Sequence, residues 1–264
     1  MRLMTYNILR GGRDGECTAR LEQACTLIQQ VSPDVLVLNE CSELERDGFR
    51  TFYRLERELG MRGIFAPARS GYHVALYVRS AQPCEVLPRE VRLLERPLHH
   101  TAIAARLTAQ GQPLTVVATH LCPFSSEARV TEVQQLSQFF GDEPLFLLGD
   151  LNSLSPHDAP ALEPGAWLPR RRVRHQLPGS AGLDTRAIAV LEASGLVDVF
   201  HAASNRAPTA LTRSCPGWQE YQVRIDYVFA SRAAAAGVRR AERVDGALAD
   251  AASDHYPLYV DVQL

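Results

Sequence analysis

The stretch PLFLLGDLN, residues 144–152, joins a short apolar run to two polar side chains at its end. A run of this length and composition is typical of a buried strand. Because alternate residues of an extended chain point to the same side, Asp150 and Asn152 can present a carboxylate and an amide to one small volume. Taken alone, the stretch fits an Asx-type turn that closes a strand equally well, so the rest of the chain has to decide.

Four other strand-like runs carry a polar residue in the same way. Asn7 lies in RLMTYNI, Glu40 follows VLVLN, His120 ends LTVVATH, and Asp226 interrupts RIDYVFAS. An unpaired carboxylate or amide is costly to bury. Five strands that each deliver such a residue therefore indicate one shared site, built on a rigid edge of the sheet.

The segment ASDHYP, Ala252–Pro257, adds Asp254 and His255 just before a last strand-like run. Oxygen ligands such as those of Glu40, Asn7 and Asp254 suit a hard cation, Mg²⁺ or Mn²⁺. A histidine acts as general base or acid near neutral pH when a carboxylate orients its second nitrogen. Phosphoryl transfer needs both the divalent charge and such donors, so the set indicates metal-assisted hydrolysis.

The pattern along the chain predicts strands mixed with a few helices. Helical spacing is found over residues 18–30 and 127–140, and AQGQP, residues 109–113, predicts a hairpin turn. A direct hairpin favours mixed or antiparallel sheets. Residues 156–181 are rich in Pro, Gly and Arg and predict irregular surface. Without a repeat or a linker, we expect a single domain over residues 1–264.

Composition limits the classes of partner. The 264 residues are 46% hydrophobic and 22% charged, with a formal net charge of −2. A protein that grips nucleic acid over a wide surface is usually basic, so any phosphate contact here must be local. The six cysteines form no C-x-x-C pair, and no apolar stretch resembles a signal peptide or a membrane span. We expect a cytoplasmic monomer with reduced thiols and no membrane partner.

Seven segments resemble, in order, motifs of the endonuclease/exonuclease/phosphatase superfamily, which has the deoxyribonuclease I-like fold. They are TYNI, LNEC, SGYHVALYV, ATHL, GDLNS, RIDYVF and SDHYP. Each motif is weak alone, but seven in the correct order are specific, and they span the chain. The resemblance implies a four-layer α/β/β/α sandwich, in which two mixed, mainly antiparallel sheets are flanked by helices.

The resemblance also assigns roles at a metal site. Glu40 is expected to be the principal ligand of Mg²⁺ or Mn²⁺, supported by Asn7 and Asp254 directly or through water. His255 is expected to be the general base or acid, with Asp226 orienting it. The same oxygens can serve one metal or two, and the sequence leaves that number open.

The remaining roles concern the transferred phosphoryl group. His120 and Asn152 would stabilise its transition state, and Asp150 would position or activate the attacking water. Whether Asp150 or His255 takes the proton is left open. Leu9 stands where apurinic endonucleases of the family carry an acid, and they have Tyr or Arg at the position of His120. Both differences favour other nucleases, tyrosyl-DNA phosphodiesterases, deadenylase-like enzymes, or inositol-phosphate and sphingolipid phosphodiesterases.

Several residues are candidates for binding substrate. PRRRVRH, residues 169–175 with Arg171, fits a phosphate clamp or a solvated loop. Trp218 could stack a base or belong to the core, as could Trp167 and Phe124. His73 and His157 flank predicted site strands.

The pair His99–His100 resembles a metal site at first sight. Because neighbours in a strand face opposite sides, we interpret both as structural or surface residues.

The leading hypothesis is a divalent-metal-dependent phosphodiesterase acting on nucleic acid or nucleotides. One alternative within the fold is a phosphatase of small molecules or lipid headgroups. The alternative outside this class is a catalytically silent binding module.

Overall fold

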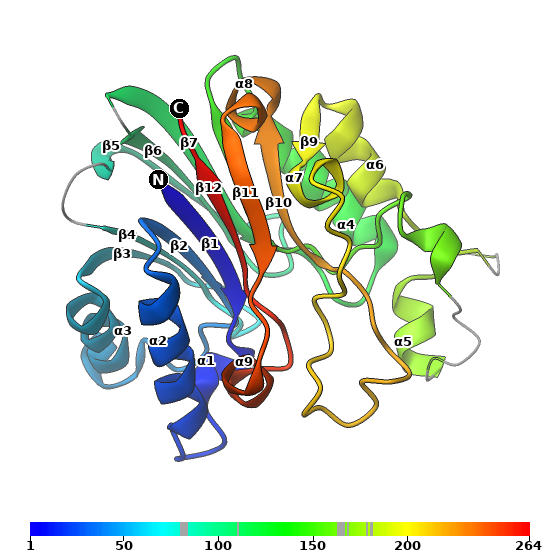
Figure 1. Cartoon of the computed structure of the whole chain (residues 1–264), viewed down its shortest axis with the longest axis horizontal. Helices are drawn as coiled ribbons and strands as arrows, with labels where there is room; N and C mark the ends of the chain where they lie inside the picture. The colour runs from blue at the N-terminus through cyan, green and yellow to red at the C-terminus, as the bar shows by residue number, and fades with distance from the viewer. Residues whose placement is uncertain (80–83, 110, 163–166, 168, 178, 180–181) are drawn as a thin grey trace.

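Two β-sheets lie face to face in the molecule (Figure 1). The computed structural model describes residues 1–79, 84–109, 111–162, 167, 169–177, 179 and 182–264. The first sheet has the order β11-β12-β1-β2-β4-β3, with bounds β1 (Arg2–Asn7), β2 (Val35–Asn39), β3 (Met61–Ala66), β4 (Val74–Arg79), β11 (Val238–Arg243) and β12 (Leu258–Val262). The second has the order β5-β6-β7-β8-β10-β9, with bounds β5 (Cys84–Leu94), β6 (Ala102–Ala109), β7 (Gln112–His120), β8 (Leu145–Asp150), β9 (Leu196–Asp198) and β10 (Asp226–Ser231).

Helices cover the outer face of each sheet. The first sheet packs on α2 (Ala19–Val31), α3 (Arg46–Leu59) and α9 (Ala247–Ala252). The second packs on α4 (Ser126–Leu136) and α6 (Arg186–Ala193). Shorter helical segments lie in the connections: α1 (Leu9–Gly12), η1 (Ser137–Phe139), η2 (Ala159–Ala161), α5 (Pro169–Arg174), α7 (Val199–Ala202) and α8 (Arg232–Ala236). The chain is therefore the expected four-layer α/β/β/α sandwich.

Strand β2 shows why its sequence is apolar without interruption. Val35 and Val37 point into the core between the sheets, whereas Leu36 and Leu38 pack toward the outer helices. Both faces of the strand are covered, so alternation with polar residues is absent. Each such side chain contributes roughly 1.5–3 kcal/mol by leaving water.

The pairing of the strands brings the polar strand ends together. Strands β1 and β2 run parallel with Asn7 opposite Asn39, and β7 and β8 run parallel with His120 opposite Asp150. The other described pairs are antiparallel, among them β8–β10, which sets Asp226 opposite Asp150. Because parallel strands end at the same edge and antiparallel partners begin there, the polar residues gather at one edge of the sandwich.

Most sequence expectations for the elements are confirmed within a residue or two. The hairpin turn is tight, since Ala109 pairs with Gln112. Helix α2 begins at Ala19, and α4 continues into η1 up to Phe139. The helix α3, in contrast, was not predicted. None of the helices in the described residues is long and apolar enough to cross a membrane.

The irregular segment expected over residues 156–181 is wrong at residues 169–174, which form α5. Tertiary contacts support this helix, because the buried guanidinium of Arg129 donates to the carbonyl of Arg174 over 2.5 Å. Pro169 occupies its first position, where the missing N–H of a proline costs nothing. Residues 163–166, 168, 178, 180 and 181 of the segment lie outside the described residues.

Candidate active site

A cleft of about 370 Å³ opens where the polar strand ends meet. Six of the side chains predicted for catalysis or metal binding line it: Glu40, His120, Asp150, Asn152, Asp254 and His255. Two others, Asn7 and Asp226, lie behind this surface and bond to its residues. The structure thus brings together all eight predicted catalytic and metal-site residues.

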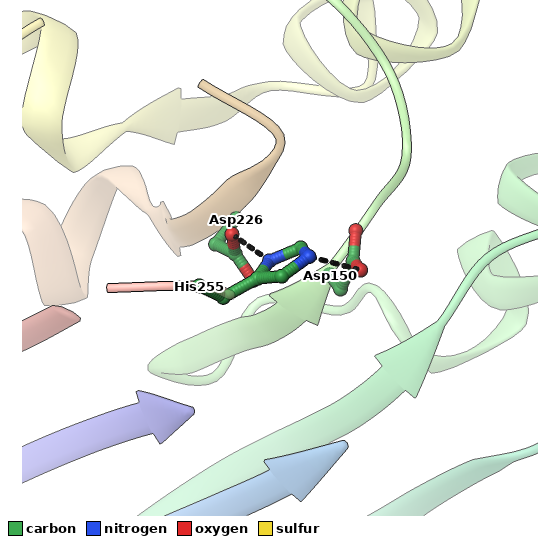
Figure 2. Close-up of side chains that lie close together, drawn as sticks. All are labelled: Asp150, Asp226 and His255. Carbon is green, nitrogen blue, oxygen red and sulfur yellow. Dashed lines mark hydrogen bonds and ion pairs between the residues drawn. The ribbon is translucent and has the colours of Figure 1, made fainter. Parts of the chain in front are cut away.

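His255 lies between two aspartates (Figure 2). Its Nδ1 is 2.8 Å from Asp226 Oδ2, and its Nε2 is 3.9 Å from Asp150 Oδ2. Burial lowers the pKa of His255, but the charges of Asp226, Asp254 and Asp150 outweigh it and raise the pKa well above the usual value. Burial and the charge of Asp226 also raise the pKa of Asp150, to about 7. This arrangement can hold and transfer a proton.

Contacts at the start of strand β10 hold Asp226 in place. Thr209 Oγ1 accepts hydrogen bonds of 3.0 Å from the N–H groups of Ile225 and Asp226. The guanidinium of Arg224 is buried, and its nitrogens lie 2.7 Å from the carboxylates of Asp158 and Asp198. The strand that carries the orienting carboxylate is therefore fixed to two neighbouring segments.

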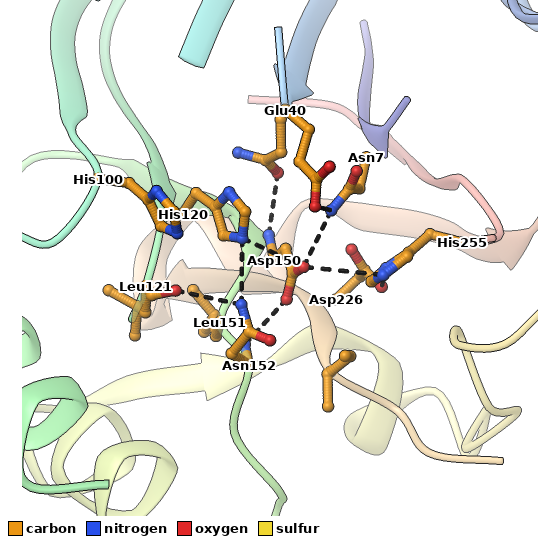
Figure 3. Close-up of polar contacts among 12 residues, drawn as sticks. Asn7, Glu40, His100, His120, Leu121, Asp150, Leu151, Asn152, Asp226 and His255 are labelled. Atoms are coloured by element: carbon orange, nitrogen blue, oxygen red, sulfur yellow. Dashed lines mark hydrogen bonds and ion pairs between the residues drawn. The ribbon is translucent and has the colours of Figure 1, made fainter. Parts of the chain in front are cut away.

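Asp150 is held by bonds from three directions (Figure 3). Asn7 Nδ2 donates to its Oδ2 over 3.0 Å, and the Asn152 N–H donates to its Oδ1 over 2.9 Å. Its own N–H donates to Asn39 Oδ1 over 3.0 Å. A carboxylate with these donors has little rotational freedom, so its oxygens have fixed positions at the cleft.

Asn39 was not among the predicted residues, although it is fully buried. Its Nδ2 donates to the carbonyl of Thr119 over 2.9 Å, so this one side chain of the first sheet bonds both β7 and β8 of the second. Gly149 makes room for these bonds. Its φ is +148°, and a Cβ there would lie 1.8 Å from the carbonyl oxygen of Thr119.

Glu40 and Asp254 form the candidate metal site. Glu40 has a φ of +57° and turns its carboxylate into the cleft, where the Arg10 N–H and Asn7 Nδ2 donate to it over 3.1 and 3.3 Å. Burial and the charge of Asp254 raise the pKa of Glu40. Two carboxylates that repel each other in a polar cleft fit a divalent cation, which would remove the repulsion.

Asn7 supports this site with its nitrogen. Because its Oδ1 accepts the Leu9 N–H over 3.0 Å, the amide N–H groups face Glu40 and Asp150. A second group of potential ligands is present in the described residues, since oxygen or nitrogen atoms of Asp150, Asp226 and His255 lie within 4.8 Å of one another.

His120 and Asn152 bond to each other. One amide hydrogen of Asn152 is donated to the carbonyl of Leu121 over 3.1 Å, and the other points to His120 Nε2 over 3.1 Å. Burial lowers the pKa of His120 well below its usual value, so the ring is neutral. Both hydrogens of the Asn152 amide are therefore engaged within the site.

His99 and His100, which we interpreted as structural or surface residues, both line the cleft, His99 as an exposed residue and His100 as a buried one. They lie in a bend before β6, so the strand geometry behind that interpretation does not apply. The His100 ring stacks on His120 with centroids 4.1 Å apart and planes 20° apart. The only hint in the sequence was the pairing of two histidines.

One wall of the cleft is aromatic and basic. Arg171 and Arg174 of α5 line it together with Tyr221 and Phe124. Arg171 lies 4.6 Å from the centroid of the Tyr221 ring, and Arg174 lies 5.8 Å from that of Phe124. Phe124 is 63% exposed, which is unusual for a large apolar side chain. This wall can meet both a phosphate and a flat ring.

Three predicted substrate contacts lie outside the described lining of this cleft. His73 lines a separate pocket of about 420 Å³, where its Nδ1 accepts the Ala68 N–H over 2.8 Å. His157 bonds to Glu192 over 2.9 Å and stacks on another histidine, His201.

Trp218 is the third of these, and it packs beside Trp167 in an apolar cluster. Trp167 is itself buried, with its ring against Tyr221, whereas Trp218 is partly buried, and neither is part of the described lining of the cleft.

Solved structures similar to this chain share its whole architecture. An AP endonuclease from Archaeoglobus fulgidus superposes with a TM-score of 0.73 at 17% identity, covering 100% of both chains. The 3′ phosphatase NExo from Neisseria, in a point variant bound to product DNA hairpin, gives 0.68 at 21% identity, again over 100% of both chains. An endonuclease/exonuclease/phosphatase from Beutenbergia cavernae gives 0.73 at 19% identity, covering 100% of this chain and 71% of the other.

At these identities the structural likeness establishes the fold alone. A search of curated proteins finds no match. The family model described as the Endonuclease/Exonuclease/phosphatase family, however, matches residues 4–255, a span that includes every residue of the site described above. The chain therefore belongs to the endonuclease/exonuclease/phosphatase family, whose members act on phosphoester bonds.

Proposed function

We propose that this protein is a divalent-metal-dependent phosphodiesterase that acts on nucleic acid or nucleotides. The observation that carries the proposal is the Asp226–His255 pair, which faces Asp150 in the same cleft as Glu40 and Asp254. A paired histidine beside an oxygen-rich cation site combines the two requirements of phosphoryl transfer to water.

Glu40 and Asp254 would hold Mg²⁺ or Mn²⁺, and Asn7 would fix the Glu40 carboxylate through Nδ2. When bound, the cation supplies positive charge to the oxygens of the scissile phosphate. A carboxylate–amide set of this kind suits these hard ions better than a soft metal. The group of Asp150, Asp226 and His255 offers further ligand atoms, so the cleft could hold one ion or two.

His255 would carry the proton in this reaction. Asp226 accepts the hydrogen on Nδ1, so Nε2 is the atom that exchanges a proton with the water or with the leaving oxygen. Asp150 lies on the Nε2 side, and its fixed oxygens orient the attacking water. His120 and Asn152 would border the phosphoryl group on the adjacent side.

The wall of Arg171, Arg174 and Phe124 supports a nucleic-acid or nucleotide substrate. Guanidinium groups pair with phosphates, and an exposed ring stacks with a base at about 1–3 kcal/mol. Two proteins of the same fold are an AP endonuclease and a 3′ phosphatase bound to a product DNA hairpin. Leu9 and His120 depart from the pattern of apurinic endonucleases, so we do not propose abasic-site cleavage.

Hydrolysis of bis-p-nitrophenyl phosphate tests the activity. We expect turnover with Mg²⁺ or Mn²⁺, none after chelation, and a loss of at least about a hundredfold in His255→Ala, the scale of one proton-transfer residue. His157→Ala is the matched control, because that histidine bonds to Glu192 away from the cleft. Metal-independent turnover, or full activity in His255→Ala, would contradict the proposal.

Substrate class is tested by a series of candidate substrates at rising salt. Single- and double-stranded DNA, RNA, 5′-tyrosyl-DNA and inositol phosphates would be compared. A polyanionic substrate predicts a steep loss of affinity with salt, whereas a small-molecule phosphatase would show little dependence.

A further inference from the structure

His100 is a buried histidine at the cleft to which the proposed reaction assigns no role. It is 2% exposed, lines the cleft, and lies face to face with His120 (Figure 3). Its two ring nitrogens have different surroundings, and this difference identifies the atom available to a ligand.

The Nδ1 atom is paired with Ser70. The distance from Nδ1 to Ser70 Oγ is 2.7 Å, and the same hydroxyl accepts the Tyr72 N–H over 3.3 Å. We assign the hydroxyl as the donor in this bond, because it has one hydrogen to donate and already accepts the Tyr72 N–H. With this assignment, Nδ1 carries the lone pair and the ring hydrogen is on Nε2.

The Nε2 atom is buried and has no hydrogen-bond partner in the part of the chain that the structure describes. Burial, and then the charge of His99, lower the pKa of His100 to about 3, so the ring is neutral at physiological pH. Native proteins rarely leave a buried N–H unpaired, and such a group at a cleft calls for an acceptor from outside.

Among the neighbouring donors on this side of the cleft, the Asn152 amide is already engaged, whereas His120 Nδ1, like His100 Nε2, is buried without a partner among the described residues. Asn152 donates one amide hydrogen to Leu121 and directs the other to His120. An oxygen that took a hydrogen of the Asn152 amide would have to break one of these bonds, whereas the Nε2–H of His100 requires no such exchange.

We propose that His100 is a substrate-binding residue whose Nε2–H donates to a non-bridging oxygen of a phosphodiester, beside His120. The identity of that oxygen rests on the proposed function. Stacking of the His100 ring also fixes the plane of the His120 ring, so a test has to separate hydrogen-bond donation by His100 from its stacking.

Substitution can separate them. His100→Phe keeps a flat ring against His120 but has no N–H, and His100→Gln keeps an N–H donor but no ring. His157→Phe is the control, because it replaces a histidine that is likewise stacked, at 3.9 Å from the His201 centroid, but away from the cleft. Circular dichroism and thermal melts establish that each variant is folded.

With thymidine 5′-p-nitrophenyl phosphate and Mn²⁺, we expect His100→Phe to lose roughly 10- to 100-fold in kcat/KM, the effect of one hydrogen bond to a charged group. His100→Gln should recover most of this loss, and His157→Phe should equal the wild type. Wild-type kcat/KM in His100→Phe, or equal losses in the Phe and Gln variants, would overturn the proposal.

A second readout does not depend on turnover. Nitrogen-15 NMR of the histidine side chains should show the Nε2–H tautomer for His100, and its Nε2 resonance should shift when inorganic phosphate is added. An Nδ1–H tautomer, or an Nε2 resonance indifferent to phosphate, overturns the role of His100 whatever the activity. A shift with phosphate in a protein that hydrolyses no phosphodiester would support His100 as an anion ligand and contradict the proposed function instead.

Discussion

Replacement of Gly149 by Ala tests how closely the two strands that carry the site approach each other. Gly149 lies opposite Thr119 in the parallel pair of β7 and β8, and an added Cβ would be 1.8 Å from the Thr119 carbonyl oxygen. Observed Cβ contacts are essentially never shorter than 3.0 Å, so β8 would have to move by roughly 1.2 Å.

The expected cost has two parts. The φ of +148° is unfavourable for any residue with a Cβ and costs about 1–3 kcal/mol. Movement of the strand also weakens the bond between Asn39 and the Asp150 N–H and neighbouring ladder bonds, at about 0.5–1.5 kcal/mol each. We expect a loss of roughly 3–5 kcal/mol in the free energy of unfolding.

Gly111→Ala is the matched control. Gly111 has a φ of +78° in the hairpin between β6 and β7, but no atom lies within 4 Å of an added Cβ. It should lose only about 1 kcal/mol. At about 2–4 °C per kcal/mol, melts should place Gly149→Ala roughly 10 °C below the wild type and Gly111→Ala only about 3 °C below.

Activity gives the second measurement. A displacement of about 1 Å at Asp150 should lower kcat by roughly a hundredfold, well below the melting temperature of the variant. Equal melting temperatures for the two alanine variants, or an unchanged kcat in Gly149→Ala, would refute the close-approach reasoning.

Three further predictions concern parts of the frame around the site. Thr209→Val leaves two buried N–H groups at the start of β10 unpaired and should lower the free energy of unfolding in urea by about 2–4 kcal/mol. Thr209→Ser keeps the hydroxyl and should be nearly neutral, so equal losses in the two variants would contradict the role of this hydroxyl. Arg224→Met leaves Asp158 and Asp198, whose oxygens lie 2.7 Å away, without their cation and should lower the free energy of unfolding by about 3–5 kcal/mol. The same replacement at the exposed Arg239 should change it very little, and similar unfolding midpoints for the two variants would exclude a buried ion-pair role. Hydrogen bonds from Arg2 lower the pKa of Asp261, so this pair stabilises the fold above the ordinary pKa near 3.8 and ceases to do so as pH falls through the lowered value. Asp261→Asn should therefore lose up to about 1 kcal/mol in the free energy of unfolding at pH 7. A difference in stability from the wild type that persists at pH 2 would contradict the assignment.

The sandwich and the core of the candidate site could be predicted from the sequence because they depend on local patterns. An apolar run that ends in a polar residue is visible in a single strand, as in VLVLN before Glu40 or LFLLG before Asp150. The motif order then supplied the four-layer arrangement of two mixed sheets, which composition and periodicity alone do not contain.

The residues that were missed depend on contacts between distant segments. Asn39 could be read as the last residue of an ordinary strand, and its role follows only from the bonds it makes to Thr119 and Asp150 across the sheets. His100 was placed in a strand, where its neighbour would face away, but a bend turns both histidines to the cleft.

Helix α5 was missed for a related reason. Its six residues are too few to be helical on their own, and the buried Arg129 supports its end from another helix. The position of Arg171 on the wall of the cleft therefore follows from packing, which a basic run in the sequence does not reveal.

The bonds at the site also link the two sheets, and this affects how the protein fails on heating. Asn7 and Asn39 of the first sheet bond to Asp150 of the second, and His255, just before β12, bonds to Asp226 of β10. Any opening of the sandwich at this edge breaks these contacts together. Thermal inactivation should therefore coincide with global unfolding, and amide hydrogens at the ends of β1 and β8 should exchange with solvent in one cooperative unit.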